Sequence, residues 1–353
     1  MPTQILTVVC PEAAMAERLN RTLMRALKGR PTEIITQPDA GRPLQNRRIL
    51  FAAALDESGV NPAMYRLLAQ LRTHPGQLEG SVAGVLVDGA GELYTKALGR
   101  DLVLSANGAG CIFPGRSLVE ATGSLRNFAV QAKNAGCTVE EAYQLAVDDL
   151  ISRILDFEPP RQAQPKIVVL HASSYRTSNT MALWSRIKQM LPPHCEVTEV
   201  GLRNGTMEDC SGCPYTMCLH FGEKGECFYG GVMVQEVYPA IREADALVML
   251  CPNYNDALSA NLTACINRLT ALYRTTSFDR KALFGVVVSG YSGGDIVAAQ
   301  LVSALCMNKG FWLPPEFCLL ETANDPGAAL KLPGIGARIE CFAQRMIGSL
   351  VVR

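Results

Sequence analysis

The sequence lacks an excess of charge of either sign. Its 353 residues include 33 Lys and Arg and 33 Asp and Glu, so the formal net charge is zero. Proteins that bind DNA or RNA normally carry a basic face that neutralises phosphates. The balance of charges therefore argues against a nucleic-acid partner.

Long hydrophobic runs are also missing. The run from Ala246 to Cys251 is among the longest, and a membrane-spanning helix needs ~20 apolar residues. The apolar stretch from Ile5 to Cys10 has no basic segment before it and soon meets Glu12, Glu17 and Arg18. This pattern is not typical of a signal peptide. We therefore expect a cytoplasmic protein without a membrane segment.

The composition favours two folded domains. Hydrophobic residues make up 48% of the chain and charged residues 19%, which permits a large core and argues against disorder. The segment 158–165 is rich in proline and polar residues and is typical of a linker. Before it, apolar residues recur at helical spacing from Val139 to Leu155, with Thr138 as the expected N-cap. We therefore expect one domain over 1–157 and a second over 166–353.

The second part alternates apolar runs of strand length with amphipathic stretches. Because the runs are continuous rather than alternating, they predict strands buried on both faces, as in a parallel sheet covered by helices. The expected strands are Ile167–Leu170, Ala246–Cys251 and Leu283–Val288, and the expected helices are Met181–Leu191, Leu262–Tyr273 and Ile296–Met307.

The first part repeats this plan. The run Gly84–Gly89 matches Gly285–Gly290 at a constant offset, and Asn107 falls opposite Asn308 at the same offset. The run from Arg48 to Ala54 corresponds to the strand at Ala246–Cys251. The sequence therefore predicts two α/β domains in tandem.

Three polar loops follow the expected strands of the second domain, at the sheet edge where such folds bind ligands. Ala172 to Thr180 combines hydroxyl and amide side chains with one arginine before a helix, which suits a phosphate; a polar loop that merely caps the helix is the alternative. Pro252-Asn-Tyr-Asn255 follows the second strand. Ser289 to Gly294 follows the third, and its glycines let backbone approach a flat ligand.

Together, these loops resemble the NADPH-dependent FMN reductase family and its relatives, the iron–sulfur flavoproteins, over about residues 166–345. The family's first loop reads Gly-Ser-x-Arg-x-x-x-Asn-Thr; here Ser173, Asn179 and Thr180 are kept and the arginine has moved one place to Arg176. The resemblance implies a flavodoxin-like, doubly wound parallel sheet of order 2-1-3-4-5. It also implies FMN as cofactor, NAD(P)H as reductant and a homodimer.

The resemblance further implies which residues hold FMN. The phosphate would be bound by Ser173, Ser174, Arg176, Ser178, Asn179 and Thr180. The ring and ribityl chain would be edged by Pro252, Asn253, Tyr254 and Asn255, with Ser289, Gly290 and Gly293 closing the other side. No catalytic side chain is required, because the chemistry belongs to the flavin.

The sequence has thirteen cysteines, an odd number that is unevenly distributed along the chain. This pattern does not resemble the disulfide framework of a secreted protein. Isolated ones, such as Cys265, Cys306 and Cys341, are expected to be small core residues. Four crowd into a cysteine-rich insertion at 208–231, namely Cys210, Cys213, Cys218 and Cys227. Such thiols, with His220 as a further candidate ligand, can hold a [4Fe–4S] cluster or Zn²⁺, or can lack a metal altogether.

The first domain lacks these features. In its first loop Glu12 would repel a phosphate, and Asp56 and Glu57 stand where Asn253 and Tyr254 would be. We therefore expect a degenerate flavodoxin-like domain that binds no flavin. The whole chain is then either an NAD(P)H oxidoreductase acting on a small acceptor, or an iron–sulfur flavoprotein that carries electrons or senses redox state with a redox-protein partner.

Overall fold

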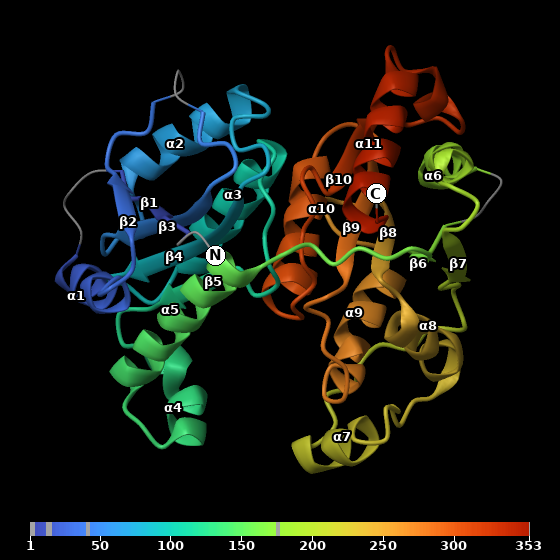
Figure 1. Ribbon diagram of the computed structural model, residues 1–353. Coiled ribbons are helices and arrows are strands. Elements are labelled where there is room, and N and C mark those ends of the chain that lie inside the picture. The colour runs from blue at the N-terminus through green and yellow to red at the C-terminus, as the bar shows by residue number, and fades with distance from the viewer. Residues whose placement is uncertain (1–3, 12–15, 40–42, 174–176, 353) are drawn as a thin grey trace. The chain divides into compact units, whose positions relative to one another are not determined.

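The computed structural model describes residues 4–11, 16–39, 43–173 and 177–352 (Figure 1). The chain divides into two compact units, Met1–Glu158 and Pro159–Arg353. Of the segment expected to be a linker, Glu158 ends the first unit and residues 159–165 belong to the second. There Gln162 pairs through its backbone with Leu350 and Val352 near the C-terminus.

The first unit alternates strands and helices from its start. Its strands are β1 (Leu6–Val9), β2 (Thr32–Ile35), β3 (Arg48–Leu55), β4 (Val82–Gly89) and β5 (Leu118–Ala121). Its helices are α1 (Glu17–Ala26), α2 (Pro62–Thr73), α3 (Thr95–Gly108), α4 (Ala129–Ala135) and α5 (Val139–Asp156), with a 3₁₀ turn at Arg126–Phe128.

The second unit repeats the alternation with a longer connection after its second strand. Its strands are β6 (Lys166–His171), β7 (Glu196–Gly201), β8 (Ala246–Pro252), β9 (Ala282–Ser289) and β10 (Cys318–Thr322). Its helices are α6 (Asn179–Met190), α7 (Tyr215–Gly222), α8 (Tyr238–Glu243), α9 (Ala260–Leu272), α10 (Gly294–Leu301) and α11 (Ile335–Leu350). Short π-helical segments cover Met233–Val237 and Val302–Met307, and a 3₁₀ turn covers Ala328–Lys331.

Both sheets are parallel and have the same strand order. The first runs β2-β1-β3-β4-β5, and the second runs β7-β6-β8-β9-β10. Numbered within each unit, both orders are 2-1-3-4-5, so the predicted flavodoxin-like plan is confirmed for two sheets in tandem. In each sheet the order reverses beside the first strand, and ligands of such sheets bind outside the strand ends at that point.

Burial explains why these runs form central strands. Every residue of β4 and of β9 is buried, as expected for strands with helices over both faces. The edge strand β7 instead alternates exposed and half-buried residues along most of its length. At the end of the first unit, Oγ1 of Thr138 accepts a hydrogen bond from the backbone N–H of Glu141. The carboxylate of Glu141 in turn accepts one from the backbone N–H of Thr138. This capping box confirms the expected start of α5.

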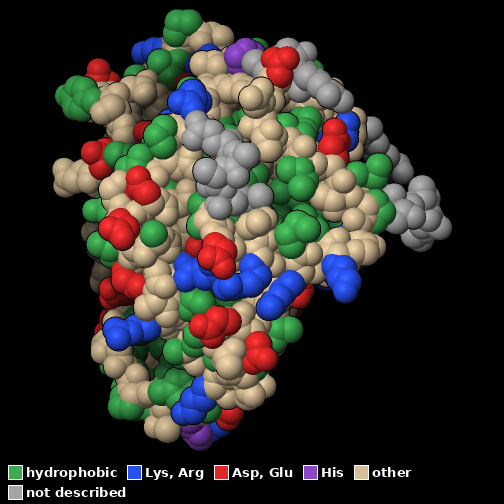
Figure 2. Space-filling view, turned by 90° about the vertical axis from the view of Figure 1, so that its left-hand side faces the viewer, with side chains coloured by type: hydrophobic (Ala, Val, Ile, Leu, Met, Phe, Trp, Pro, Cys, Tyr) green, Lys and Arg blue, Asp and Glu red, His purple; other side chains and the backbone are tan. Residues whose placement is uncertain are grey.

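The surface agrees with the balanced composition. On the face shown in Figure 2, several basic side chains form a row across the middle, and acidic side chains lie above and below this row. Among the described helices, none has the length and apolar character that spanning a membrane requires.

Candidate functional site

A cavity of about 620 Å³ lies at the carboxyl ends of the strands of the second sheet. Small-molecule pockets commonly measure ~300–1,000 Å³. Its walls come from the loops after β6, β8, β9 and β10. The lining residues predicted from the sequence are Ser173, Ser178, Asn179, Thr180, Pro252, Asn253, Tyr254, Asn255 and Gly290.

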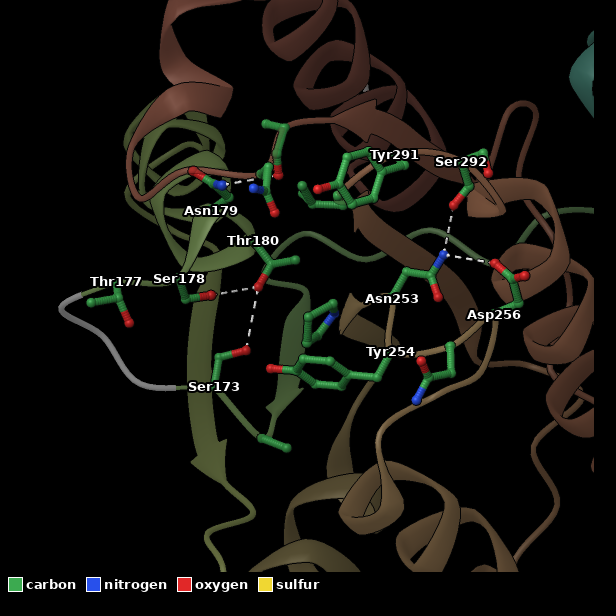
Figure 3. A pocket seen from close by; sticks show the side chains of 17 residues that line it. Ser173, Thr177, Ser178, Asn179, Thr180, Asn253, Tyr254, Asp256, Tyr291 and Ser292 are labelled. Carbon is green, nitrogen blue, oxygen red and sulfur yellow. Dashed lines mark hydrogen bonds between the residues drawn. The ribbon is translucent and has the colours of Figure 1, made fainter.

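Three hydroxyl groups meet at the start of α6. The Oγ of Ser178 accepts a hydrogen bond from the backbone N–H of Met181, so Ser178 caps the helix. Its Oγ lies 2.8 Å from Oγ1 of Thr180, which lies 3.4 Å from Oγ of Ser173. Ser174 and Arg176, also predicted to bind phosphate, lie outside the described residues. Ser178 can therefore cap the helix and also bind a phosphate, because its hydroxyl faces the cavity while it caps α6 (Figure 3).

Asn179 has a different role from its neighbours. Its Nδ2 donates to the carbonyl oxygens of Ala323 and Asp325, and its Oδ1 accepts from the backbone N–H of Ala329. The side chain thus joins α6 to the segment that follows β10. Asn179 lines the cavity, but its amide group is engaged by the protein itself.

Asn253, at the end of β8, carries an unsatisfied acceptor. Its Nδ2 donates to Oγ of Ser289 at 3.1 Å and to the carbonyl oxygen of Ser292 at 2.8 Å. Its Oδ1 is buried and has no hydrogen-bond partner. Buried acceptors without a partner are rare and call for an explanation, and a ligand that donates to Oδ1 is one such explanation.

Two tyrosines enter the cavity from neighbouring loops. Figure 3 shows Tyr254 and Tyr291 across from Ser173, Ser178 and Thr180. Their side chains are 58% and 85% exposed, respectively, although large aromatic side chains are usually buried. After Tyr254 the backbone turns through Asn255 and Asp256, which both have positive φ angles. Exposed rings beside a strained turn are typical of a ligand site.

Two predicted residues do not line the cavity. Ser289 is buried, and its Oγ accepts a hydrogen bond from Nδ2 of Asn253. Gly293 has a φ of +82°, and a Cβ at this position would collide with the side chains of Asp256 and Asn253. Ser289 and Gly293 therefore shape the β8 loop from behind.

Several lining residues were not predicted from the sequence. The polar ones are Thr177, Asp256, Tyr291, Ser292 and Asn324. Asn324 was missed because the short edge strand β10 alternates in burial and gave no continuous apolar run. Tyr291 and Ser292 lie inside the glycine-rich loop that was recognised, but turn composition does not tell which side chains face a ligand.

His171 is the last residue of β6, just before the loop that leads to α6. Its Nδ1 lies 3.3 Å from the carbonyl oxygen of Ser173, which can only accept, so Nδ1 carries the proton. Burial lowers the pKa of His171 below its ordinary range, because the charged form loses hydration. The imidazole is therefore neutral at pH 7.

The four crowded cysteines share a second, small cavity of about 80 Å³. Nη2 of Arg274 lies 3.8 Å from Sγ of Cys218, and Asp209 accepts from the backbone N–H of Cys210. His220 lies at the surface, where its Nε2 is 3.2 Å from Nζ of Lys224. Within the described part of the chain, no three His, Cys, Asp or Glu residues are grouped so as to hold a metal ion. The side chains as arranged do not fit a cluster or Zn²⁺, and the metal site stays a prediction.

The remaining cysteines mostly behave as core residues. Cys265 and Cys306 are buried, as expected, and burial raises the pKa of Cys265 to about 12. Cys341 is exposed, so its assignment to the core was wrong. It lies on α11, where the next two residues, Phe342 and Ala343, are buried. Successive residues of a helix point about 100° apart, so Cys341 can face outward beside them.

Comparison with known proteins confirms the resemblance expected from the loops. Residues 165–325 match the model of the NADPH-dependent FMN reductase family. Similar solved structures include an NADH:FMN oxidoreductase in its apo form (15% identity, 54% of this chain and 91% of that chain, TM-score 0.38). Others are the NAD(P)H:quinone oxidoreductase from Methanothermobacter marburgensis (17%, 53% and 96%, TM-score 0.37) and an FMN-dependent NADH-azoreductase from Bacillus anthracis in complex with FMN (12%, 52% and 99%, TM-score 0.34). No curated protein matches the chain.

Proposed function

We propose that the protein is an FMN-dependent oxidoreductase that takes hydride from NAD(P)H and passes hydride or electrons to a small acceptor such as a flavin or quinone. The observation that carries the proposal is the meeting, in one cavity, of a hydroxyl-lined helix start, an unsatisfied amide oxygen and two exposed tyrosines. The family match over residues 165–325 supports it.

The helix start fits the phosphate of FMN. Ser173, Ser178 and Thr180 offer hydroxyl donors beside the backbone N–H groups of the first turn of α6. The positive end of the helix dipole stabilises an anion there. No carboxylate lines this end of the cavity among the described residues.

The opposite end fits a flat ring with an N–H group. The isoalloxazine ring of FMN carries such a group, which can donate to the buried Oδ1 of Asn253. Tyr254 and Tyr291 offer aromatic faces for stacking. Asp256 also lines this end, and its negative charge disfavours anionic groups beside the ring.

Bound FMN would supply the hydride and electron chemistry. The chain's own residues then bind and orient: the α6 start holds the phosphate, and Asn253 fixes the ring edge. In this proposal no side chain has to transfer a proton at the reacting atoms, because the residues only bind and orient the flavin.

The test is a visible spectrum of the full chain purified without oxygen, followed by NADPH and NADH consumption with a quinone acceptor. We expect flavin bands and oxidation of at least one nicotinamide cofactor. Ser173→Ala should lower flavin content, and Arg176→Ala should do the same. Absence of flavin bands even after added FMN would overturn the proposal.

A second candidate is an electron carrier or redox sensor that uses FMN with an iron–sulfur cluster, serving a redox protein. Its support is that four cysteines line one cavity, and these side chains would have to rearrange to bind a cluster. Counting iron and sulfide on the same anaerobic sample decides: about four irons per chain would indicate a [4Fe–4S] centre. Size measurement on that sample also tests the proposed homodimer.

For the first unit we propose no flavin site. Arg18 of α1 donates to the carbonyl oxygens of Gly89, Thr122 and Gly123 and forms an ion pair with Asp88. These bonds tie α1 to the ends of β4 and β5, the edge that carries the cavity in the second unit. One bound FMN per chain, rather than two, is the expected stoichiometry.

A further inference from the structure

A second large cavity, of about 700 Å³, lies in the same unit beside the edge strand β7. It shares no lining residue with the cavity assigned to FMN. His171 of β6 and Arg268 of α9 are buried in its wall, whereas Arg203, Glu208 and Glu236 are exposed. None of the described residues that the family resemblance assigns to FMN lines it.

Arg268 is the unusual residue of this cavity. Its side chain is only 3% exposed, yet it forms no ion pair with any described carboxylate. Its two hydrogen bonds go to backbone: Nη1 donates to the carbonyl oxygen of Glu208 and Nη2 to that of Gly230. A buried charge is normally paired with an opposite charge, because burial removes its hydration.

The guanidinium group of Arg268 also has N–H groups that its two hydrogen bonds do not use. An arginine offers five N–H groups, and Arg268 uses two of them in the bonds above. Its Nε is buried without any hydrogen-bond partner. A carboxylate or phosphate presents the acceptor oxygens that such a planar group binds most strongly.

The surrounding chain is built to hold Arg268 in place. The loops that accept its two hydrogen bonds, around Glu208 and Gly230, both contribute to the cavity wall. The π-helical turn Met233–Val237 follows directly, and its residues Gln235 and Glu236 line the cavity. Such turns occur frequently at functional sites.

We propose that this cavity is a second binding site, which takes the carboxylate or phosphate group of a small organic ligand against Arg268. Arg203 adds a positive charge at the rim. Three carboxylates that also line the cavity, Glu199, Glu208 and Glu236, oppose a second negative charge on the ligand. The site therefore prefers a singly charged oxyanion whose remaining part is neutral or cationic. This proposal stands on Arg268 and does not depend on flavin binding.

The test measures the thermal unfolding midpoint of the full chain while chloride is replaced by acetate or by inorganic phosphate at constant ionic strength. A ligand that binds the folded state raises the midpoint in a saturable way. The experiment is done in Ser178→Asp, because a carboxylate at the start of α6 removes the other anion site. Acetate and phosphate separate the two possible ligand groups, and we expect acetate to bind more tightly at pH 8.

Arg268→Gln should weaken acetate binding at least about tenfold, since a hydrogen bond to a charged group is lost. Because Arg268 is buried and its loss can prevent folding, two exposed rim variants give an independent result. Arg203→Gln should weaken binding about two- to fivefold, and Glu236→Gln should strengthen it by a similar factor.

Matched controls are Arg186→Gln and Glu223→Gln, which change the same charges at exposed positions outside the cavity. They should leave the anion response unchanged. A linear, non-saturating response to both anions would overturn the proposal. So would rim variants that respond as their controls do.

Discussion

The side-chain amide of Asn253 points its Nδ2 at Oγ of Ser289, 3.1 Å away, and thereby leaves its own Oδ1 buried without a partner. The orientation is fixed because Ser292 also offers a carbonyl oxygen, an acceptor, to the same Nδ2. Asn253 lines the cavity, and the fold itself leaves its Oδ1 without a partner.

Replacing this acceptor should weaken flavin binding. In Asn253→Ala we expect the Kd for FMN to rise about three- to tenfold, the loss of one hydrogen bond. Titration of FMN fluorescence against the full chain measures it. Asn20→Ala, an exposed asparagine on α1, is the control and should leave the Kd unchanged. Equal affinity in the two variants would argue against a flavin donor at Oδ1.

Ser178 allows capping and phosphate binding to be separated. Ser178→Ala should lose about 1 kcal/mol of unfolding free energy with the cap and should also weaken FMN binding. Ser178→Asp keeps a good cap but places a negative charge beside the phosphate, so stability should persist while FMN binding falls at least about tenfold.

Urea unfolding and FMN titration of both Ser178 variants give the two quantities. Thr138→Asp makes the same change at the cap of α5 in the first unit and should affect neither. If Ser178→Asp bound FMN as well as the native chain, the phosphate would have to lie elsewhere.

His171 should make stability depend on pH. Its pKa is lowered in the folded state by burial, whereas in the unfolded chain it is about 6.5. The unfolded state therefore binds the proton more readily, and stability that is present above about pH 6.5 is lost as the pH falls toward the folded pKa. Urea unfolding between pH 7.5 and 5.5 should show this loss.

His171→Gln removes the titrating group and should flatten part of that slope. His194→Gln, which removes a histidine elsewhere in the second unit, is the comparison. A slope that is the same in native chain and His171→Gln would show that other groups cause the loss.

Asp88 should be essential to the first unit. It is 2% exposed and accepts from Nη2 of Arg18 at 2.8 Å and from the hydroxyl of Tyr143 at 3.1 Å. Asp88→Asn leaves the guanidinium without its counter-charge and should cost about 3 kcal/mol of unfolding free energy. Tyr143→Phe should cost only about 1 kcal/mol.

A double-mutant cycle of Arg18→Met and Asp88→Asn, measured by urea unfolding, gives the coupling between the two side chains. Additive losses would mean that the pair contributes nothing as a pair. Flavin content should stay the same in all of these variants.

The sequence predicted the sheets well because their central strands are covered on both faces. Continuous apolar runs such as Leu283–Val288 have few alternatives to a buried parallel strand. The similar run at Gly84–Gly89 predicted a buried parallel strand in the first unit for the same reason. The short edge strand β10 gave no such signal, and Asn324 beyond it was missed.

The sequence predicted which loops form the site, but not which side chains of those loops face the cavity. Ser178 and Asn253 lie where expected, whereas Ser289 supports Asn253 from behind. Which side chain faces a cavity depends on loop backbone, such as the positive φ angles of Asn255 and Asp256, and local composition does not determine these angles. The solitary charge of Arg268 is likewise visible only when the fold shows what surrounds it.

The division of the chain at Glu158 has a consequence during synthesis. Each sheet is built from one continuous stretch of sequence, so the first can close its core before the second is translated. At about 5–20 residues per second, the remainder takes on the order of 10–40 s to emerge from the ribosome. The first unit therefore has time to fold alone before a second parallel sheet of the same order is made.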